Sequence, residues 1–512
     1  MTLLAVQTGR SIEGDLEVRA QVAVVGSGTG GAVMAAILAE AGLDVVILEE
    51  GPYIPDHVYQ AYRPTETLRY LGREAGTTAV LGLGDSPLIT VMAGRGVGGS
   101  SLLTGGVCFR VPEYIHDRWV HERGLGDLSA EHMDAAFSSA ELASSVETVP
   151  EHMRSKAIRR FVDGATKLGI PVKPLRRNTS HCEGLARCNF GCPKGAKQSV
   201  DKTYLPRAIV AGARLYSDVL VEKVTTKGGR ATGVEGRLLG EKTAKGQPKK
   251  GRVRVIADHV VIAAGSLHTP LLLMRSGLRT AGVGRHLTLH PGFRMVGRFE
   301  DPVMGWQGAL QSAYIDAFEK DGLTFNALFV PPSVLAAGMP GVGREFADRI
   351  QHMSHLGIFG CLVHDDDGGR VHRIPGREPL LTYRLSPRNK VALIKGAKIL
   401  VEIFLAAGAR EVYPPFFGMP PIRSMAEANT HLVDSLSARR MECVTFHPLG
   451  TCRIGKDRDS GVVNSYGCAF DLAGLTVADG SIFPTSIGVN SQLPIMAMAT
   501  RIGWRLRETL RA

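Results

Sequence analysis

Short apolar runs alternate with glycine-rich turns and amphipathic stretches, and this pattern predicts a mixed α/β protein. It indicates a buried strand at Gln21–Val25, a helix at Ala32–Ala41 and a second strand at Asp44–Leu48. Segments of similar character return over Tyr204–Gly277 and from Leu475 onward. We therefore expect one α/β domain that is assembled from separate parts of the chain.

The stretches between these segments have a different pattern. Leu125–Leu168 has the spacing of two surface helices, and Asp301–Pro415 alternates short strands with one long helix at Lys390–Ala407. That helix precedes Gly408, a residue type that is common just past a helix end. A second, sheet-rich domain is therefore expected to be inserted into the first.

The turn after the first strand carries a G-x-G-x-x-G pattern at Gly26, Gly28 and Gly31. In such a turn the first glycine permits a tight bend, the second lets a pyrophosphate approach the backbone, and the third allows close helix–strand packing. Glu49 ends the second strand, at the distance expected for a carboxylate that binds ribose hydroxyls. The pattern predicts a dinucleotide at the helix N-terminus and leaves FAD and NAD both open.

Composition and charge narrow the class of protein. The 512 residues are 44% hydrophobic and 21% charged, which excludes a disordered chain. The net charge is +11, but ten Lys or Arg against two Glu lie between Lys223 and Arg254, without aromatic residues among them. This stretch is typical of a solvated hairpin loop, so we expect no nucleic-acid partner.

The apolar runs also bear on location. Met1–Ala20 lacks the apolar core of a secretory signal, and glycines interrupt the longest apolar region, Val22–Leu48. No transmembrane segment is expected, which leaves peripheral contact with a membrane open. We expect a cytoplasmic protein.

Several blocks resemble a known family. Gly94–Ser101 with Gly105-Gly106, Val261–Pro270, Phe446–Cys452, Val477–Ser481 and Gly488–Asn490 resemble, in the same order, the signatures of the glucose–methanol–choline (GMC) oxidoreductases. The resemblance covers nearly the whole chain and implies FAD as the cofactor. Within the family, the chain is similar to long-chain alcohol oxidases and to GMC-type cholesterol oxidases.

The resemblance implies a discontinuous, Rossmann-like FAD-binding domain with an inserted α+β substrate domain built on an antiparallel sheet. We assign residues 1–124, 200–300 and 430–512 to the FAD-binding domain, and 125–199 and 301–429 to the substrate-binding domain.

The family's cofactor contacts carry over to matching positions of this sequence. They are Gly26, Gly28, Gly31, Glu49, Gly98, Gly99, Ser100, Ser101, Val221, Gly265, Asp479 and Gly480. The loop before Gly106 has no histidine of the kind that attaches FAD in some members, so non-covalent FAD is expected. Thr104 stands where related sequences often carry Asn, so contacts with the flavin ring can differ there.

His447 and Asn490 match the family's catalytic positions. Alcohol oxidation removes a hydroxyl proton and a carbon-bound hydride, and His447 is the expected base because a neutral imidazole titrates near working pH. Asn490 would hydrogen-bond the alcohol oxygen. The expected reaction converts an apolar long-chain or sterol-like alcohol to an aldehyde or ketone, with hydride passing to flavin N5. Oxygen or another acceptor would then reoxidise the flavin.

Three other functions compete with alcohol oxidation. A fatty-acid photodecarboxylase-like GMC flavoenzyme and a non-catalytic flavin-binding redox protein both stay open as alternatives, although His447 and Asn490 favour catalysis. An NAD-linked dehydrogenase would leave the C-terminal blocks unexplained.

Cys182, Cys188 and Cys192 lie close together in the sequence. Their spacing lacks the paired C-x-x-C of a zinc ribbon and has no obvious fourth ligand, so no metal site is predicted. Free thiols, a disulfide and a metal site all stay open for these three residues.

Overall fold

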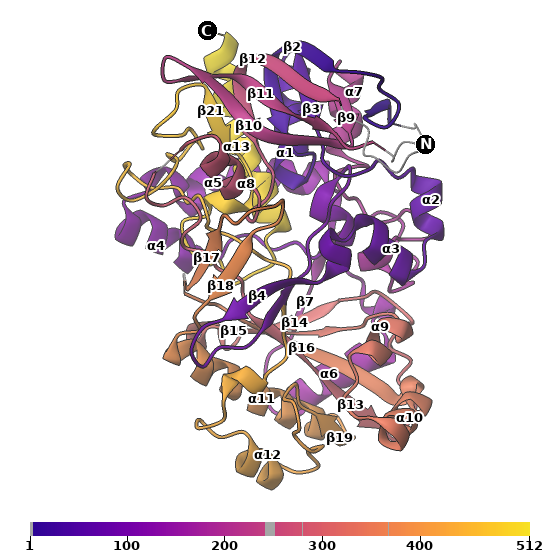
Figure 1. Ribbon diagram of the computed structural model, residues 1–512. Helices are drawn as coiled ribbons and strands as arrows, with labels where there is room; N and C mark the ends of the chain where they lie inside the picture. The colour runs from indigo at the N-terminus through magenta and orange to yellow at the C-terminus, as the bar shows by residue number, and fades with distance from the viewer. Residues whose placement is uncertain (1–3, 241–250, 279, 367, 512) are drawn as a thin grey trace.

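Two large β-sheets organise the molecule, one in the upper and one in the lower half of Figure 1. The structure is a computed structural model that describes residues 4–240, 251–278, 280–366 and 368–511. The first sheet has eight strands and the second has eleven. Within these described ranges, no helix has both the length and the apolar character needed to cross a bilayer.

The first sheet takes its strands from widely separated parts of the chain. Its order is β1 (Val6–Thr8), β9 (Arg214–Ser217), β3 (Val45–Leu48), β2 (Leu16–Val25), β12 (Arg252–Ile262), β11 (Arg230–Leu238) and β10 (Val219–Lys227), with β21 (Leu475–Val477) also on β12. The strands from β1 to β12, and β21, are parallel, whereas β10, β11 and β12 form an antiparallel meander. This confirms the predicted discontinuous α/β fold.

Helix α1 (Thr29–Glu40) is buried along almost its whole length. It packs against α13 (Gln492–Arg511) and α7 (Tyr204–Val210), and α5 (Ala130–Ala143) packs on α13 in turn. A helix that is covered on all sides needs apolar residues all round, which explains its alanine-rich, apolar sequence. Helix α1 begins at Thr29, three residues before the predicted start. Its first turn contains Gly30 and Gly31, which lie close to neighbouring backbone.

The second sheet is mostly antiparallel. Its order is β17 (Gly369–His372), β18 (Leu380–Tyr383), β4 (Thr78–Gly82), β5 (Ile89–Val91), β20 (Cys443–Thr445), β13 (Gly292–Phe299), β16 (Leu356–Val363), β15 (Leu323–Leu328), β14 (Ala313–Ile315) and β7 (Lys173–Pro174), with β19 (Ala409–Tyr413) also on β13. Of the described strand pairs in this second sheet, only β18–β4 and β20–β5 are parallel. The antiparallel sheet predicted for the substrate side is therefore present.

Two helices cover one face of this sheet, α6 (Lys156–Lys167) and α11 (Pro387–Ala406). Phe359 of β16 stacks on Phe404 of α11, with ring centroids 3.9 Å apart, and meets Phe161 of α6 edge-on at 4.9 Å. Burying each such ring contributes roughly 1.5–3 kcal/mol to folding. The sheet is thus held rigid from behind, and its other face is left for the cavity described below.

The second sheet also includes β4, β5, β13 and β20, which come from ranges that we assign to the FAD-binding domain. The two parts therefore interleave more finely than the assigned boundaries, which stay a prediction. Short strands such as β20, three residues long, carry too little pattern to reveal which sheet they join.

The remaining elements are mostly short. They are α2 (Asp56–Ala61), α3 (Pro64–Leu71), α4 (Glu113–Arg123), α8 (Thr269–Arg275), α9 (Pro332–Ala337), α10 (Gly343–Gln351), α12 (Met425–His431) and the pair β6 (Val146–Thr148) and β8 (Arg176–Asn178). The basic stretch runs through β10, β11 and the start of β12, and its residues 241–250 lie outside the described part. Lys223 pairs there with Glu235, and Arg237 with Glu222.

Candidate active site

A cavity of about 330 Å³ is lined by residues of both sheets. The predicted site residues on its wall are Gly26, Gly28, Glu49, Gly99, Ser100, Ser101, Val221, Gly265, His447, Asp479, Gly480 and Asn490. Gly31 and Gly98 lie behind the wall. Segments up to about 460 residues apart in the chain therefore meet around one space. The individual roles of these residues stay predictions.

The three fingerprint glycines differ in what a side chain would meet. Gly26 has a φ of +98°, which L side chains rarely adopt, and an added Cβ would lie 2.3 Å from the Ala263 carbonyl oxygen. A Cβ on Gly31 would lie 1.9 Å from the Gly26 carbonyl oxygen. A Cβ on Gly28 would meet only the Gly99 Cα, at 3.8 Å, and would otherwise face the cavity. A pyrophosphate cradle needs a tight backbone turn, close packing of helix on strand and an open approach to the backbone, and the three glycines provide one each.

Glu49 lies at the end of β3 beside this cradle. Its carboxylate accepts hydrogen bonds from the Ser27 backbone N–H at 3.0 Å, the Ser27 hydroxyl at 2.7 Å and the Gly51 N–H at 2.8 Å. Burial raises the pKa of Glu49, although these bonds oppose the shift. A carboxylate has about four lone-pair sites, so capacity remains for a hydroxyl donor such as a ribose.

Asp479 connects three segments of the cradle. It accepts hydrogen bonds from the backbone N–H groups of Gly265 and Ser481, both at 2.8 Å, and from the Thr269 hydroxyl. Burial raises the pKa of its carboxyl group. These bonds fix the ends of β12 and β21 relative to α8, and thus the width of the cavity between them.

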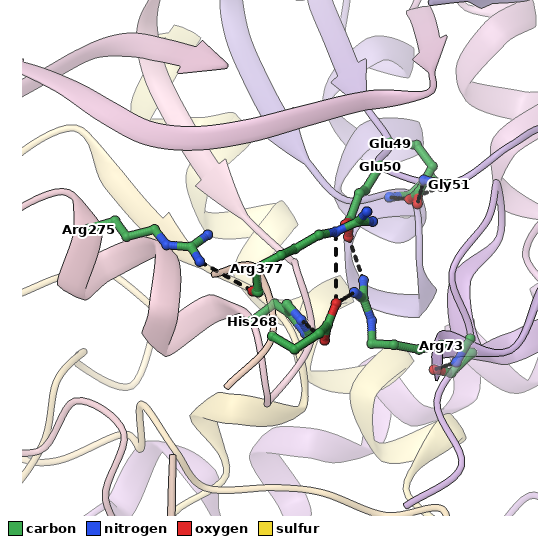
Figure 2. Close-up of polar contacts among 11 residues, drawn as sticks. Glu49, Glu50, Gly51, Arg73, His268, Arg275 and Arg377 are labelled. Carbon is green, nitrogen blue, oxygen red and sulfur yellow. Dashed lines mark hydrogen bonds and ion pairs between the residues drawn. The ribbon is translucent and has the colours of Figure 1, made fainter. Parts of the chain in front are cut away.

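An ionic cluster borders the cavity beside Glu49 (Figure 2). Arg73 donates to Glu50 at 2.5 Å and to Glu378 at 2.9 Å, and Arg377 pairs with Glu50. The His268 Nε2 lies 3.0 Å from a Glu378 oxygen. Burial opposes ionisation of Glu378, but the bonds to His268 and Arg73 outweigh it and lower the pKa of Glu378 to about 2. The cluster joins the β17–β18 hairpin to the first sheet.

Replacing Arg73 by methionine should destabilise the protein by about 2–3 kcal/mol, because it leaves the Glu50 and Glu378 carboxylates partly buried without their main counter-charge. Urea unfolding would measure the change in the free energy of unfolding. Arg63→Met is the matched control, since Arg63 also pairs with a glutamate but is exposed, and its loss should cost under about 1 kcal/mol. Equal effects of the two substitutions would contradict the prediction.

The segment that contains Cys182, Cys188 and Cys192 lies against the loop 94–106. All eight cysteines of the chain are free, and Cys188 Sγ accepts a hydrogen bond from the buried Arg177 at 2.7 Å. In the part of the chain that the structure describes, no group of three or more His, Cys, Asp or Glu residues is placed to hold a metal ion. The buried ammonium of Lys197 lies within 3.2 Å of four carbonyl oxygens, those of Ser101, Leu102, Thr104 and Cys188. Lys197 thus ties this segment to the cavity wall.

His447 and Asn490 reach the cavity from different sheets. His447 follows β20 of the second sheet, and Asn490 follows β21 of the first and lies two residues before the start of α13. The Asn490 Nδ2 lies 3.1 Å from the His447 Nε2, and only 8% of His447 is exposed. Burial lowers the pKa of His447 to about 4, so its imidazole is neutral at physiological pH.

A second histidine, His290, stands behind His447. Its Nε2 accepts the backbone N–H groups of Ile487 and Gly488 at 3.2 and 3.1 Å, so its Nδ1 carries the proton when the ring is neutral. The Nδ1 atoms of the two histidines are 3.4 Å apart. Asp365 holds His290 in place by accepting its backbone N–H at 3.0 Å.

The residues that the sequence analysis missed are the ionic cluster, Lys197 as an anchor, and His290 with Asp365. Each depends on partners that are distant in sequence. A signal for His290 was that it directly precedes Pro291, at the end of a stretch from Val283 that also resembles the family but implied no role for this histidine.

Comparisons with known proteins agree with this arrangement. Two family profiles described as GMC oxidoreductase match residues 23–292 and 369–499. A GMC-type oxidoreductase of Mycobacterium tuberculosis, named as uncharacterized, is 36% identical over 94% of this chain and 75% of its own length. A long-chain-alcohol oxidase of Arabidopsis thaliana is 26% identical over 97% of this chain and 67% of its own length.

A solved structure of pyridoxine 4-oxidase from Mesorbium loti superposes with a TM-score of 0.74 at 19% identity. The superposition covers 96% of this chain and 99% of that one, and it supports the fold. The glycine cradle, the free acceptor capacity of Glu49 and the family profiles together identify FAD as the cofactor. The chain belongs to the GMC oxidoreductase family and is an oxidoreductase.

Proposed function

We propose that the protein oxidises an alcohol to an aldehyde or ketone, with His447 as the base and Asn490 as the residue that positions the hydroxyl group. The observation that carries this proposal is the 3.1 Å contact between the Asn490 amide and the His447 Nε2 on the cavity wall. A hydroxyl group bound at this pair, in place of their direct contact, would have a proton acceptor and a hydrogen-bond donor within reach.

The reaction balances with one proton and one hydride. Bound FAD supplies the hydride acceptor. The hydroxyl proton passes to the His447 Nε2 while the carbon-bound hydrogen leaves with its electron pair, and the C–O bond becomes a double bond. Burial keeps His447 neutral before the step, since its pKa of about 4 lies below physiological pH, so the Nε2 lone pair is present to accept the proton.

The tautomer of His447 decides whether the Nε2 is free. The proton on the His290 Nδ1 points at the Nδ1 of His447, and the Asn490 amide donates to the Nε2 of His447. A neutral imidazole has only one nitrogen that can accept a hydrogen bond, so His447 cannot accept both. Base chemistry requires the proton on Nδ1, and therefore requires the long 3.4 Å contact to His290 to open. Asn490 holds the reactive tautomer.

The residues that line the cavity support FAD as the cofactor, and we expect it to be bound without a covalent link to the protein. The predicted cofactor residues follow the wall from Gly28 to Gly480, and Gln492, the first residue of α13, faces the same space together with the preceding Ser491. The positive end of that helix would stabilise negative charge on the reduced flavin. Thr104, which donates to the Gln492 side chain at 2.7 Å, closes the wall there.

The walls of the cavity favour an apolar substrate. They include Leu310, Leu328, Phe329, Val330, Leu362 and Phe446. An apolar long-chain or sterol-like alcohol fits such walls, and the named activity of the Arabidopsis relative supports the long-chain class. Oxygen or another acceptor would reoxidise the flavin. The cytoplasmic location and the absence of a nucleic-acid partner stay predictions.

Anaerobic titration of the FAD-bound protein tests the proposal. Decanol, an aromatic alcohol, a sugar and cholesterol would be added separately, and loss of the flavin's visible absorption would be recorded. We expect decanol to bleach the flavin, and admission of air then distinguishes an oxidase from a dehydrogenase. Flavin that none of these alcohols bleaches would contradict the proposal, and decanoate loss under light would favour the photodecarboxylase alternative.

A further inference from the structure

A polar row crosses the apolar floor of the cavity on the second sheet. Arg294 of β13 pairs with Gly360 of β16, and Gly360 pairs with Asn326 of β15. Residues directly opposite one another in antiparallel strands project to the same face, and all three line the cavity. Arg294 and Asn326 therefore flank a gap in which Gly360 contributes no side chain.

Leu328 and the Asn326 amide border this gap closely. A Cβ on Gly360 would lie 3.2 Å from the Asn326 Oδ1 and 3.0 Å from Leu328, so a larger residue would crowd this part of the floor. The Asn326 Oδ1 is buried, and no hydrogen-bond partner for it exists among the described residues. This oxygen only accepts hydrogen bonds, so a carboxylate cannot satisfy it, and any contact of Asn326 with an anion has to use the N–H groups of its Nδ2.

Arg294 carries a positive charge that the protein balances only weakly. Within the described ranges its one ion pair is to Glu442, at 3.9 Å, and the Glu442 side chain is 51% exposed. Burial lowers the pKa of Arg294, and Glu442 offsets this only partly. A guanidinium has five N–H donors and binds carboxylates through two parallel hydrogen bonds.

We propose that Arg294 binds a carboxylate of the substrate, so that the alcohol oxidised at His447 is a hydroxy acid with an apolar chain. The inference rests on the proposed function and narrows its substrate class. Gly292 pairs with Val444, three residues before His447, and Arg294 lies two residues farther along β13, about 7 Å away. The carboxylate would thus bind farther along the floor than the hydroxyl group, with the apolar chain against Leu362, which pairs with Gly292.

The first test compares 10-hydroxydecanoate, its methyl ester and decanol as substrates. We expect the highest kcat/KM for the free acid. Arg294→Met should lower the ratio of kcat/KM for 10-hydroxydecanoate to that for decanol by about 10- to 100-fold, because a charged hydrogen bond is lost. Equal values for acid and ester, or an unchanged ratio in the variant, would overturn the proposal.

Arg298→Met is the matched control. Arg298 lies on the same strand and has the same 29% side-chain exposure, but it pairs with Glu411 at 3.2 Å and does not line the cavity. This variant should keep the wild-type ratio. A fall as large as that in Arg294→Met would show a general effect on β13 and would overturn the assignment.

The second test is independent of oxidation. Calorimetric titration of the FAD-bound protein with decanoate, which has no hydroxyl group to oxidise, should give a Kd that Arg294→Met raises about 10- to 100-fold. Glu442→Gln keeps Arg294 and removes its counter-charge, so it should tighten decanoate binding by up to about fivefold. Arg294-dependent binding without any alcohol oxidation would uphold the carboxylate site and contradict the proposed reaction. If the protein oxidises decanol but Arg294→Met leaves the Kd for decanoate unchanged, the proposed reaction stands and the carboxylate site is contradicted.

Discussion

His447→Ala should lower the rate constant of anaerobic flavin reduction by decanol about 100- to 10,000-fold. The hydroxyl proton then has no acceptor within hydrogen-bond distance, since the Asn490 amide donates. FAD binding should persist, because His447 lies on the side of the cavity formed by the second sheet, away from the glycine cradle. Stopped-flow absorbance of the flavin measures the rate constant directly.

His447→Gln distinguishes a base from a hydrogen-bond donor. Glutamine retains an N–H donor but cannot take a proton, so it should be as impaired as alanine; a nearly wild-type rate would contradict the base. His152→Ala, at an exposed residue outside the cavity, is the control and should be unaffected.

In the wild type, the rate constant should be level through neutral pH and fall as the pH drops through about 4. Protonation of His447, whose pKa is about 4, removes the acceptor there.

Gly28→Val should raise the Kd for FAD about 100-fold or more. The backbone at Gly28 has a φ of −68°, which valine adopts readily, and its Cβ direction is open except for the Gly99 Cα. The added side chain would therefore occupy the space that the cofactor pyrophosphate needs and would disturb little of the protein. The flavin-to-protein absorbance ratio and titration of the apoprotein with FAD measure the loss.

The apoprotein of this variant should still fold, with a loss of about 1 kcal/mol because valine is unfavourable at a helix N-terminus. Gly126→Val is the matched control, since an added Cβ there meets no described atom within 4 Å and the residue does not line the cavity. Normal FAD content in Gly28→Val, or equal loss in Gly126→Val, would contradict the role assigned to Gly28.

The nucleotide cradle was predictable because its determinants are consecutive. Gly26, Gly28 and Gly31 impose a turn, an open approach and a close contact within six residues, and the flanking strand and helix follow from local periodicity. The placement of Asn490 opposite His447 followed only from resemblance, since nothing in the local pattern relates residues 43 positions apart.

The ionic cluster was not predictable, because Arg73 and Glu378 are 305 residues apart and each has an ordinary surface-like neighbourhood in the sequence. The polar row at Arg294 was hidden for a different reason. Its members belong to three strands whose register only the folded sheet defines, and Arg294 alone reads as an exposed position in an alternating strand.

The position of β21 and α13 has a consequence for synthesis on the ribosome. These elements, which supply Asp479 and the helix N-terminus at the cavity, emerge about 450 residues after β2, whose turn begins the cradle. At translation rates of about 5–20 residues per second, β2 and α1 wait roughly 20–90 s for the strand and helix that complete them. Cofactor loading therefore has to follow translation, and an incomplete chain exposes the apolar surface of α1 to chaperones during that interval.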